Sequence, residues 1–93
     1  MSSQVVVLEE PHSVGEWRIG YVDEVPAVGD RDGRWYRVPK DAVIPHASTQ
    51  LVWLRQQDEW TCIHQRHWDP QKVPPTPMEV LVKDGPVFVE PRE

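Results

Sequence analysis

The most reactive side chains of this 93-residue chain lie within one short stretch, Cys62-Ile63-His64-Gln65-Arg66-His67. Thiolate and imidazole groups are preferred Zn²⁺ ligands, so Cys62, His64 and His67 are the candidate metal ligands. A tetrahedral site needs a fourth ligand, and the sequence has neither a CxxC motif nor a second ligand pair. The stretch therefore predicts an ordinary half-buried thiol beside polar histidines, and we expect no metal and no other cofactor.

Covalent catalysis has little support in the sequence. The four serines fall in predicted termini and loops without nucleophile-elbow spacing, and no glycine-rich phosphate loop occurs. A cysteine nucleophile would also need electropositive surroundings. We therefore expect a protein that is not an enzyme.

The reactive residues belong to a predicted β-hairpin. Two apolar-aromatic runs, Leu51–Arg55 and Trp60–His64, flank a polar tetrapeptide, which is the pattern of two strands and a turn. With Gln57-Asp58 at the tip, the register fixes three facing pairs: Arg55 with Trp60, Trp53 with Cys62, and Leu51 with His64.

The two faces of this hairpin differ in character, because alternate residues point to opposite sides of a strand. The aliphatic face is predicted to pack on the core and consists of Val52, Leu54, Thr61 and Ile63. The aromatic face is either a binding surface, on which Arg55 can stack on Trp60, or the floor under a second sheet. As a binding surface, its predicted contact residues are Trp53, Arg55, Trp60, His64 and Trp68, with Trp35 and Arg37 from the preceding hairpin.

The rest of the chain predicts an all-β fold. Val5–Leu8 is a short apolar run typical of a buried or newly paired strand, and Glu16–Val25 and Arg34–Val38 read as strands on either side of the turn residues Asp32-Gly33. Ten prolines disfavour long helices. We expect a small SH3-like barrel or sandwich of short antiparallel strands.

The predicted organisation has two parts. Residues 1–69 form the β core, and residues 70–93 hold a proline-rich arm followed by a hairpin over Glu79–Glu90. This hairpin is expected to turn at Asp84-Gly85 and to pack on the core or on a partner. Because Pro86 lacks the N–H that closes a two-residue turn, its loop is expected to be longer or bulged. Its strands are candidates for β-augmentation, in which a strand joins the sheet of another protein.

The net charge and the absence of targeting signals limit the classes of partner and the compartments that we expect for this protein. The formal net charge of −5 disfavours nucleic acid, although Arg31, Arg34, Arg37 and Lys40 form a basic strip beside Trp35. One cysteine cannot form an internal disulfide, and neither a signal peptide nor an apolar run of membrane-spanning length is present. We expect a cytoplasmic protein, or a virion protein if the chain comes from a phage, with no membrane partner.

One segment resembles a known family. Gly33–Pro45, GRWYRVPKDAVIP, resembles the core β-barrel motif of the actinobacterial RNA-polymerase-binding protein RbpA, in which a glycine, an aromatic residue, Val-Pro, Ala, Ile-Pro and a later tryptophan recur. Trp53 is the candidate for that tryptophan. The match covers about a fifth of the chain, is one residue shorter inside the motif, and lacks the family's basic C-terminal sigma-binding helix. The resemblance implies a partner in the transcription machinery.

These observations together predict a protein-binding module, an accessory, adaptor or structural subunit of a larger phage or bacterial assembly. A regulator that binds RNA polymerase is the first alternative, and a small metal- or nucleic-acid-binding domain is the second. Self-association is also compatible with the sequence.

Overall fold

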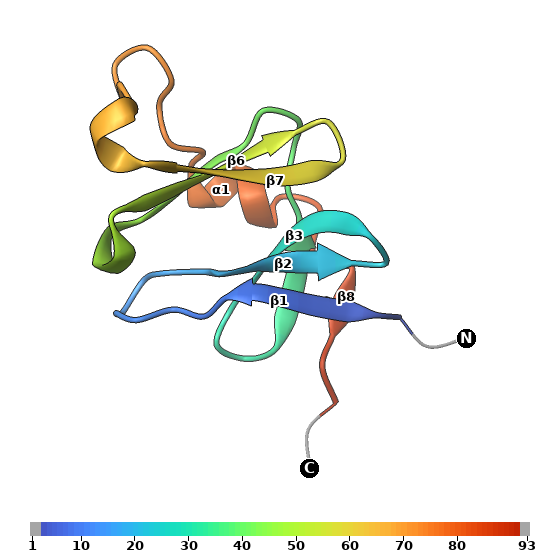
Figure 1. The fold of residues 1–93 in the computed structure, drawn as a ribbon. Helices are drawn as coiled ribbons and strands as arrows, with labels where there is room; N and C mark the ends of the chain where they lie inside the picture. The colour runs from blue at the N-terminus through green and yellow to red at the C-terminus, as the bar shows by residue number, and fades with distance from the viewer. Residues whose placement is uncertain (1–2, 92–93) are drawn as a thin grey trace.

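A computed structural model of the chain, describing residues 3–91, contains two antiparallel sheets (Figure 1). The larger sheet has the strand order β1-β2-β3-β4-β8, and the smaller has the order β5-β6-β7. The strands of the larger sheet are β1 (Val5–Glu9), β2 (Arg18–Val22), β3 (Val25–Gly29), β4 (Arg34–Arg37) and β8 (Phe88–Val89). Those of the smaller sheet are β5 (Val43–His46), β6 (Leu51–Gln56) and β7 (Glu59–His64).

Helical structure is limited to three short segments among the described residues. They are the 3₁₀ turns Ala47–Thr49 and Gln65–His67 and the helix α1 (Met78–Val82). The prediction of a small, mostly β, antiparallel fold is confirmed. The two sheets pack against each other as layers and do not close into a barrel.

The central hairpin has the predicted register. β6 and β7 pair Arg55 with Trp60, Trp53 with Cys62 and Leu51 with His64. Gln57 occupies the left-handed region at φ 57°, as a tight two-residue turn between twisted strands requires. Alternation and a polar tip were therefore sufficient to place every pair.

A first core lies between the two sheets. It joins Ile19 and Val28 of the larger sheet to Ile44 and Trp60 of the smaller one, with Leu81 of α1 covering the end. Trp53 packs against this cluster as well. The aromatic face of the central hairpin is therefore the face that lies on the other sheet, which was the second of the two interpretations of the sequence.

A second core lies on the opposite face of the larger sheet. It consists of Val22, Ala27 and Trp35, and both Val5 of β1 and Phe88 of β8 pack against it. Two strands at opposite ends of the strand order thus contact one cluster, because the twisted sheet curls around Trp35. Trp35 is completely buried.

The prediction of a C-terminal hairpin over Glu79–Glu90 is wrong. Most of its predicted first strand lies in helix α1. Its predicted second strand contains β8, which pairs with β4 and not with the first strand of the predicted hairpin. Pro86 explains the failure, since proline lacks the N–H with which a two-residue turn after Asp84-Gly85 would close. The segment therefore does not form the hairpin whose strands were expected to join the sheet of another protein.

The proline-rich arm lies on its own protein. The Thr76 amide donates to the Val43 carbonyl (2.9 Å), and the Thr76 hydroxyl accepts from the Val43 amide (2.9 Å). The arm therefore pairs with the free edge of β5 at Val43. Residues 1–2 and 92–93, which belonged to the predicted division of the chain, lie outside the described residues. Within the described range, no helix has the length and apolar character needed to cross a membrane.

Candidate functional site

The candidate metal ligands do not converge. Cys62 is an exposed thiol, His64 Nδ1 accepts a hydrogen bond from the Arg66 amide (3.1 Å), and His67 Nε2 accepts one from Arg66 Nε (3.3 Å). Residues 3–91 contain no group of three or more His, Cys, Asp or Glu side chains that could hold a metal ion. Desolvation and the charge of Glu9 both raise the pKa of the Cys62 thiol, so the protonated form, a poor nucleophile, is favoured.

The predicted contact tryptophans of the central hairpin are parts of the fold. Trp60 is buried, and its Nε1 donates to the Gly20 carbonyl (2.6 Å) while its amide donates to the Tyr21 hydroxyl (2.9 Å). Trp53 is half-buried, and its Nε1 is buried without a hydrogen-bond partner among the described residues. Trp68 is half-buried and donates to the Val73 carbonyl (2.7 Å), which fastens the arm.

The predicted arginines occupy different environments. Arg55 is 12% exposed, and it joins its hairpin to the rest of the chain by donating to the Val38 carbonyl through Nη1 (2.6 Å). The stacking predicted for Arg55 on Trp60 is absent from the cation–π contacts of the described residues, where Arg18 lies over Trp35 instead, 4.7 Å from the ring centroid. Arg37 is exposed at the end of β4.

Trp35 belongs to a side-chain clamp that holds β8. Its Nε1 donates to Glu90 Oε1 (2.7 Å), and the Arg18 guanidinium, stacked above the indole, pairs with the same oxygen (2.9 Å). The hydrogen bond from Trp35 and the charge of Arg18 lower the pKa of Glu90 despite its partial burial. We call Arg18, Trp35 and Glu90 the C-terminal clamp.

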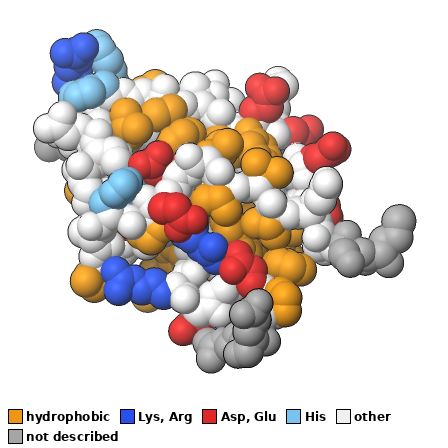
Figure 2. Space-filling model, turned by 60° about the horizontal axis from the view of Figure 1, so that its bottom comes forward, with side chains coloured by type: hydrophobic (Ala, Val, Ile, Leu, Met, Phe, Trp, Pro, Cys, Tyr) orange, Lys and Arg blue, Asp and Glu red, His pale blue; other side chains and the backbone are white. Residues whose placement is uncertain are grey.

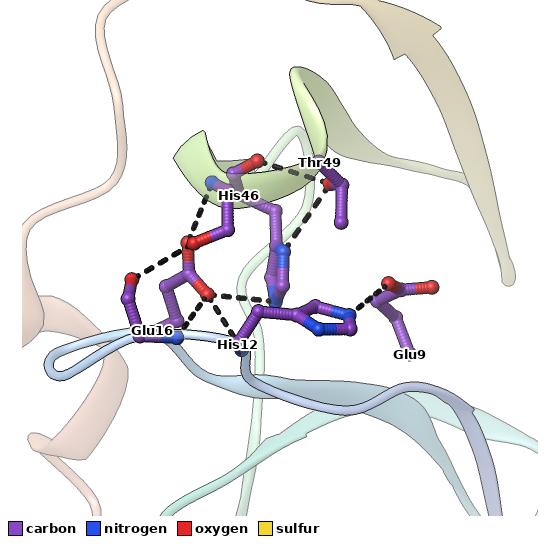
Figure 3. A network of polar contacts seen from close by, with 7 residues as sticks. Glu9, His12, Glu16, His46 and Thr49 are labelled. Atoms are coloured by element: carbon purple, nitrogen blue, oxygen red, sulfur yellow. Dashed lines mark hydrogen bonds and ion pairs between the residues drawn. The ribbon is translucent and has the colours of Figure 1, made fainter.

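A polar network that the sequence did not indicate lies between the β1–β2 loop and the 3₁₀ turn Ala47–Thr49 (Figure 3). Glu16 accepts hydrogen bonds from the backbone amides of His12 (2.8 Å), Ser13 (3.0 Å) and Ser48 (2.9 Å). Burial raises the pKa of Glu16, but these bonds outweigh it, and the net effect lowers the pKa from 4.5 to about 2. Glu16 therefore remains ionised and joins the loop to the smaller sheet.

His46 is the chemically unusual member of this network. It is completely buried, its Nε2 lies 3.6 Å from Glu16 Oε1, and Nε2 has no hydrogen-bond partner among the described residues. The Thr49 hydroxyl lies 3.3 Å from His46 Nδ1 but donates to the His46 carbonyl (3.0 Å). The Glu16 carboxylate, the His46 imidazole and the Thr49 hydroxyl thus lie next to one another in space, as the catalytic groups of a hydrolase do. The hydroxyl, however, donates its hydrogen bond to a backbone carbonyl, and the imidazole is completely buried. The arrangement supports structure rather than nucleophilic attack.

Strand β1 lies at one edge of the larger sheet, and its outer side pairs with no other strand among the described residues. Its middle residues are exposed apolar side chains: Val6 at 52%, Val7 at 38% and Leu8 at 41%. Figure 2 shows hydrophobic side chains gathered on one face of the molecule, with both acidic and basic side chains beside them. Natural edge strands usually carry lysine, proline or inward-pointing charges that prevent pairing, and the Val5–Leu8 run has none of these.

The register shows which backbone groups β1 presents to solvent. The Asp23 amide donates to the Gln4 carbonyl (2.8 Å), and the pairs Val5–Val22, Val6–Tyr21 and Val7–Gly20 follow. Because hydrogen-bonded and non-bonded pairs alternate in an antiparallel ladder, Val6 directs its N–H and C=O toward β2, whereas Val5 and Val7 direct theirs outward. The ladder shifts between Val7 and Glu9, so the regular edge ends at this bulge.

Known proteins provide no further guide to this site. Comparison of the chain with family models, with curated proteins and with solved structures gives no match.

Proposed function

We propose that this chain is a non-enzymatic protein-binding module that pairs with a protein partner along the β1 edge. It would serve as an accessory or structural subunit of a larger bacterial or phage assembly. The observation that supports the proposal is an edge strand that pairs with β2 on its inner side only and has three consecutive exposed apolar residues, Val6, Val7 and Leu8. A strand added to this edge would bond to the outward N–H and C=O groups of Val5 and Val7 while burying apolar side chains.

The other edges of the two sheets offer less. β8 has only two residues, and Thr76 of the proline-rich arm already bonds to the N–H and C=O of Val43 in β5. β7 is the outer strand of the smaller sheet, but Trp60 within it is buried by contacts with β2. Among the edge strands, β1 therefore presents the longest run of exposed apolar residues. The predicted contact residues of the central hairpin are not needed for this mode of binding.

The test compares two exposed valines of the same sheet. Val6 on β1 and Val89 on β8 are exposed to nearly the same extent, 52% and 54%. Val6→Lys places a charge on the proposed pairing edge, and Val89→Lys places the same charge on the other edge. Tagged wild-type chain and both variants would be used for affinity capture from a lysate of the source organism, with proteins identified by mass spectrometry.

We expect Val6→Lys to lose a stoichiometric partner that both the wild type and Val89→Lys retain. Val7→Pro is a second variant, because it removes an outward N–H and leaves the inward bonds of Val6 in place. Circular dichroism would establish that each variant is folded. Retention of the partner by folded Val6→Lys and Val7→Pro would refute the proposed edge.

A further inference from the structure

Beside the β1 edge lies a shallow groove of about 250 Å³, lined by Gln4, Val6, Tyr21 and Glu24. Val6 and Tyr21 are cross-strand partners and therefore lie on the same face of the sheet. The Tyr21 hydroxyl accepts the Trp60 amide, which fixes the ring as one wall. The groove thus has an aromatic and aliphatic lining with a carboxylate at its rim.

Glu24 is the residue that gives this groove a chemical preference. It is exposed, and its carboxylate makes no hydrogen bond or ion pair with the residues that the structure describes. Asp23, its neighbour in the β2–β3 turn, is exposed as well. At the other end of β1 lie Glu9 and Glu10. At that end Glu9 contacts His12 Nε2 (3.0 Å), and Glu10 shares a hollow with Arg18 and Arg31. The carboxylates without a cationic neighbour therefore lie at the Glu24 end of the apolar edge, and the whole chain carries a net charge of −5.

We infer that the strand that docks on β1 carries a lysine or arginine that enters this groove, and that basic residues flank its apolar centre. The inference rests on the proposed function, because it names the chemistry of the partner at the same edge. Long basic side chains have an apolar stem and a charged head. The stem would lie against Val6 and Tyr21, and the head would reach the Glu24 carboxylate.

A second copy of this chain is a poorer occupant of the same edge. An antiparallel pair centred on Val6 would match the outward groups of Val5 with those of Val7 in the partner copy, so backbone geometry permits it. The acidic ends of the two copies would then lie near each other, and like charges across an interface oppose association. Charge complementarity therefore favours a basic partner.

The backbone at Glu24 gives the test a second readout. Asp23 and Glu24 adopt φ values of 52° and 69°, a left-handed conformation that favours glycine over residues with a Cβ. Glu24→Gly should therefore leave the fold as stable or more stable while removing the carboxylate. A role confined to stability predicts that binding follows stability, whereas the proposed role predicts that binding is lost as stability is kept.

The experiment uses the full chain and two synthetic peptides. Each has a central Val-Thr-Val-Thr-Val segment, flanked at both ends by two lysines in one peptide and by two glutamines in the other. Binding would be measured by titration with NMR detection at low and at high salt. The variants are Glu24→Gln and Glu24→Gly, with Glu79→Gln, an exposed glutamate of α1, as the matched control.

We expect the lysine peptide to shift resonances of β1 and of the β2–β3 turn, with an affinity that falls as salt rises. Glu24→Gln and Glu24→Gly should weaken binding about five- to tenfold, the range of a partly desolvated charge pair, and Glu79→Gln should not. Equal binding of both peptides, or full affinity of the Glu24 variants, would overturn the inference. So would a β1-dependent dimer of the chain in sedimentation equilibrium.

The outcomes separate this inference from the proposed function. If both peptides bind alike and Val6→Lys abolishes both, the edge is a docking site and the basic preference is wrong. If neither peptide binds and Val6→Lys also leaves capture of the natural partner unchanged, the edge itself is refuted and both proposals fail together.

Discussion

The two edge strands of the five-stranded sheet differ in their length and in the contacts that hold them. At one edge, β8 contributes only two residues, but side chains hold it through the C-terminal clamp of Arg18, Trp35 and Glu90. At the other edge, β1 is a full strand of five residues that backbone pairing with β2 holds on one side only.

The difference shows where each edge obtains its stability. A side-chain clamp can fasten a very short strand, because one buried indole and one shared carboxylate replace many ladder hydrogen bonds. β1 has enough ladder on its inner side to need no clamp, so its outer groups stay available. An exposed, apolar edge that carries no lysine or proline up to the bulge at Val7–Glu9 is uncommon in a monomer, and the proposed partner rests on this feature.

Removal of the C-terminal clamp should have the largest effect on stability. Trp35→Ala should reduce the free energy of unfolding by about 3–5 kcal/mol, as expected for loss of a fully buried tryptophan. Urea denaturation followed by circular dichroism measures the loss. The half-buried Trp68 is the matched control, and Trp68→Ala should cost clearly less. Equal losses in the two variants would show that the clamp has no special weight.

The opposite edge can be loosened at Gly20. A Cβ on Gly20 would collide with the backbone carbonyl of Val6, which cannot move without displacing β1. Gly20→Ala should therefore cost about 1–3 kcal/mol and raise hydrogen exchange in β1 more than at the amide of Glu90. Val7→Ala, a change at an exposed side chain of the same strand, is the control. Unchanged exchange in β1 would contradict the tight packing of the two strands.

Acid should destabilise the protein at the loop between β1 and β2, which the Glu16 carboxylate holds. Glu16 has a pKa of about 2 in the folded protein and 4.5 as its ordinary value, so its stabilising effect is complete above about pH 4.5. That effect is lost as pH falls through the folded pKa, because protonation weakens the bonds to His12, Ser13 and Ser48. Stability measured by thermal melts should decline between pH 4.5 and 2, and Glu16→Gln should be less stable at pH 7 and flatten this part of the profile. A profile of the same slope in the variant would assign the acid sensitivity elsewhere.

The finest test of the comparison needs no substitution. The Val87 and Glu90 amides, which donate to Trp35 and Gly33 carbonyls (both 2.8 Å), should exchange slowly with solvent deuterium. Along β1, the Val6 amide should also exchange slowly, while Val5 and Val7, whose amides point outward, should exchange rapidly. Uniform protection along β1 would mean that the outer groups of this strand are already paired.

Local signals in the sequence were sufficient for the central hairpin, but they missed the hairpin of β2 and β3. The strand expected over Glu16–Val25 is divided by a turn at Asp23-Glu24, and β3 (Val25–Gly29) follows it. Alternation around Gln57-Asp58 predicted every pair of β6 and β7, and the turn residues before Arg34 placed β4. The run Val5–Leu8 was correctly predicted as a strand, but apolar composition alone did not distinguish a buried strand from an exposed edge. The absence of any lysine or proline within that run was the signal available for an unprotected edge.

Features that depend on distant residues could not be predicted in the same way. Trp35 and Glu90 are 55 positions apart, and Glu16 and Ser48 are 32 positions apart, so no spacing rule connects them. The near-palindrome of Glu79–Glu90 favoured a local hairpin, whereas the actual partner of its second half was β4. Long-range pairing overrode local symmetry because the clamp buries Trp35 and Phe88 together.

The shortness of β8 has a consequence for how far assembly can proceed. Open-ended sheet growth requires every subunit to offer two usable edges, one to join and one to be joined. Here the second edge is β8, whose two residues lie within the four-residue segment between Pro86 and Pro91, and Glu90 of that segment is bonded to Trp35. A subunit added through β1 would therefore leave no template for the next one, and the product would be a finite complex instead of a fibril.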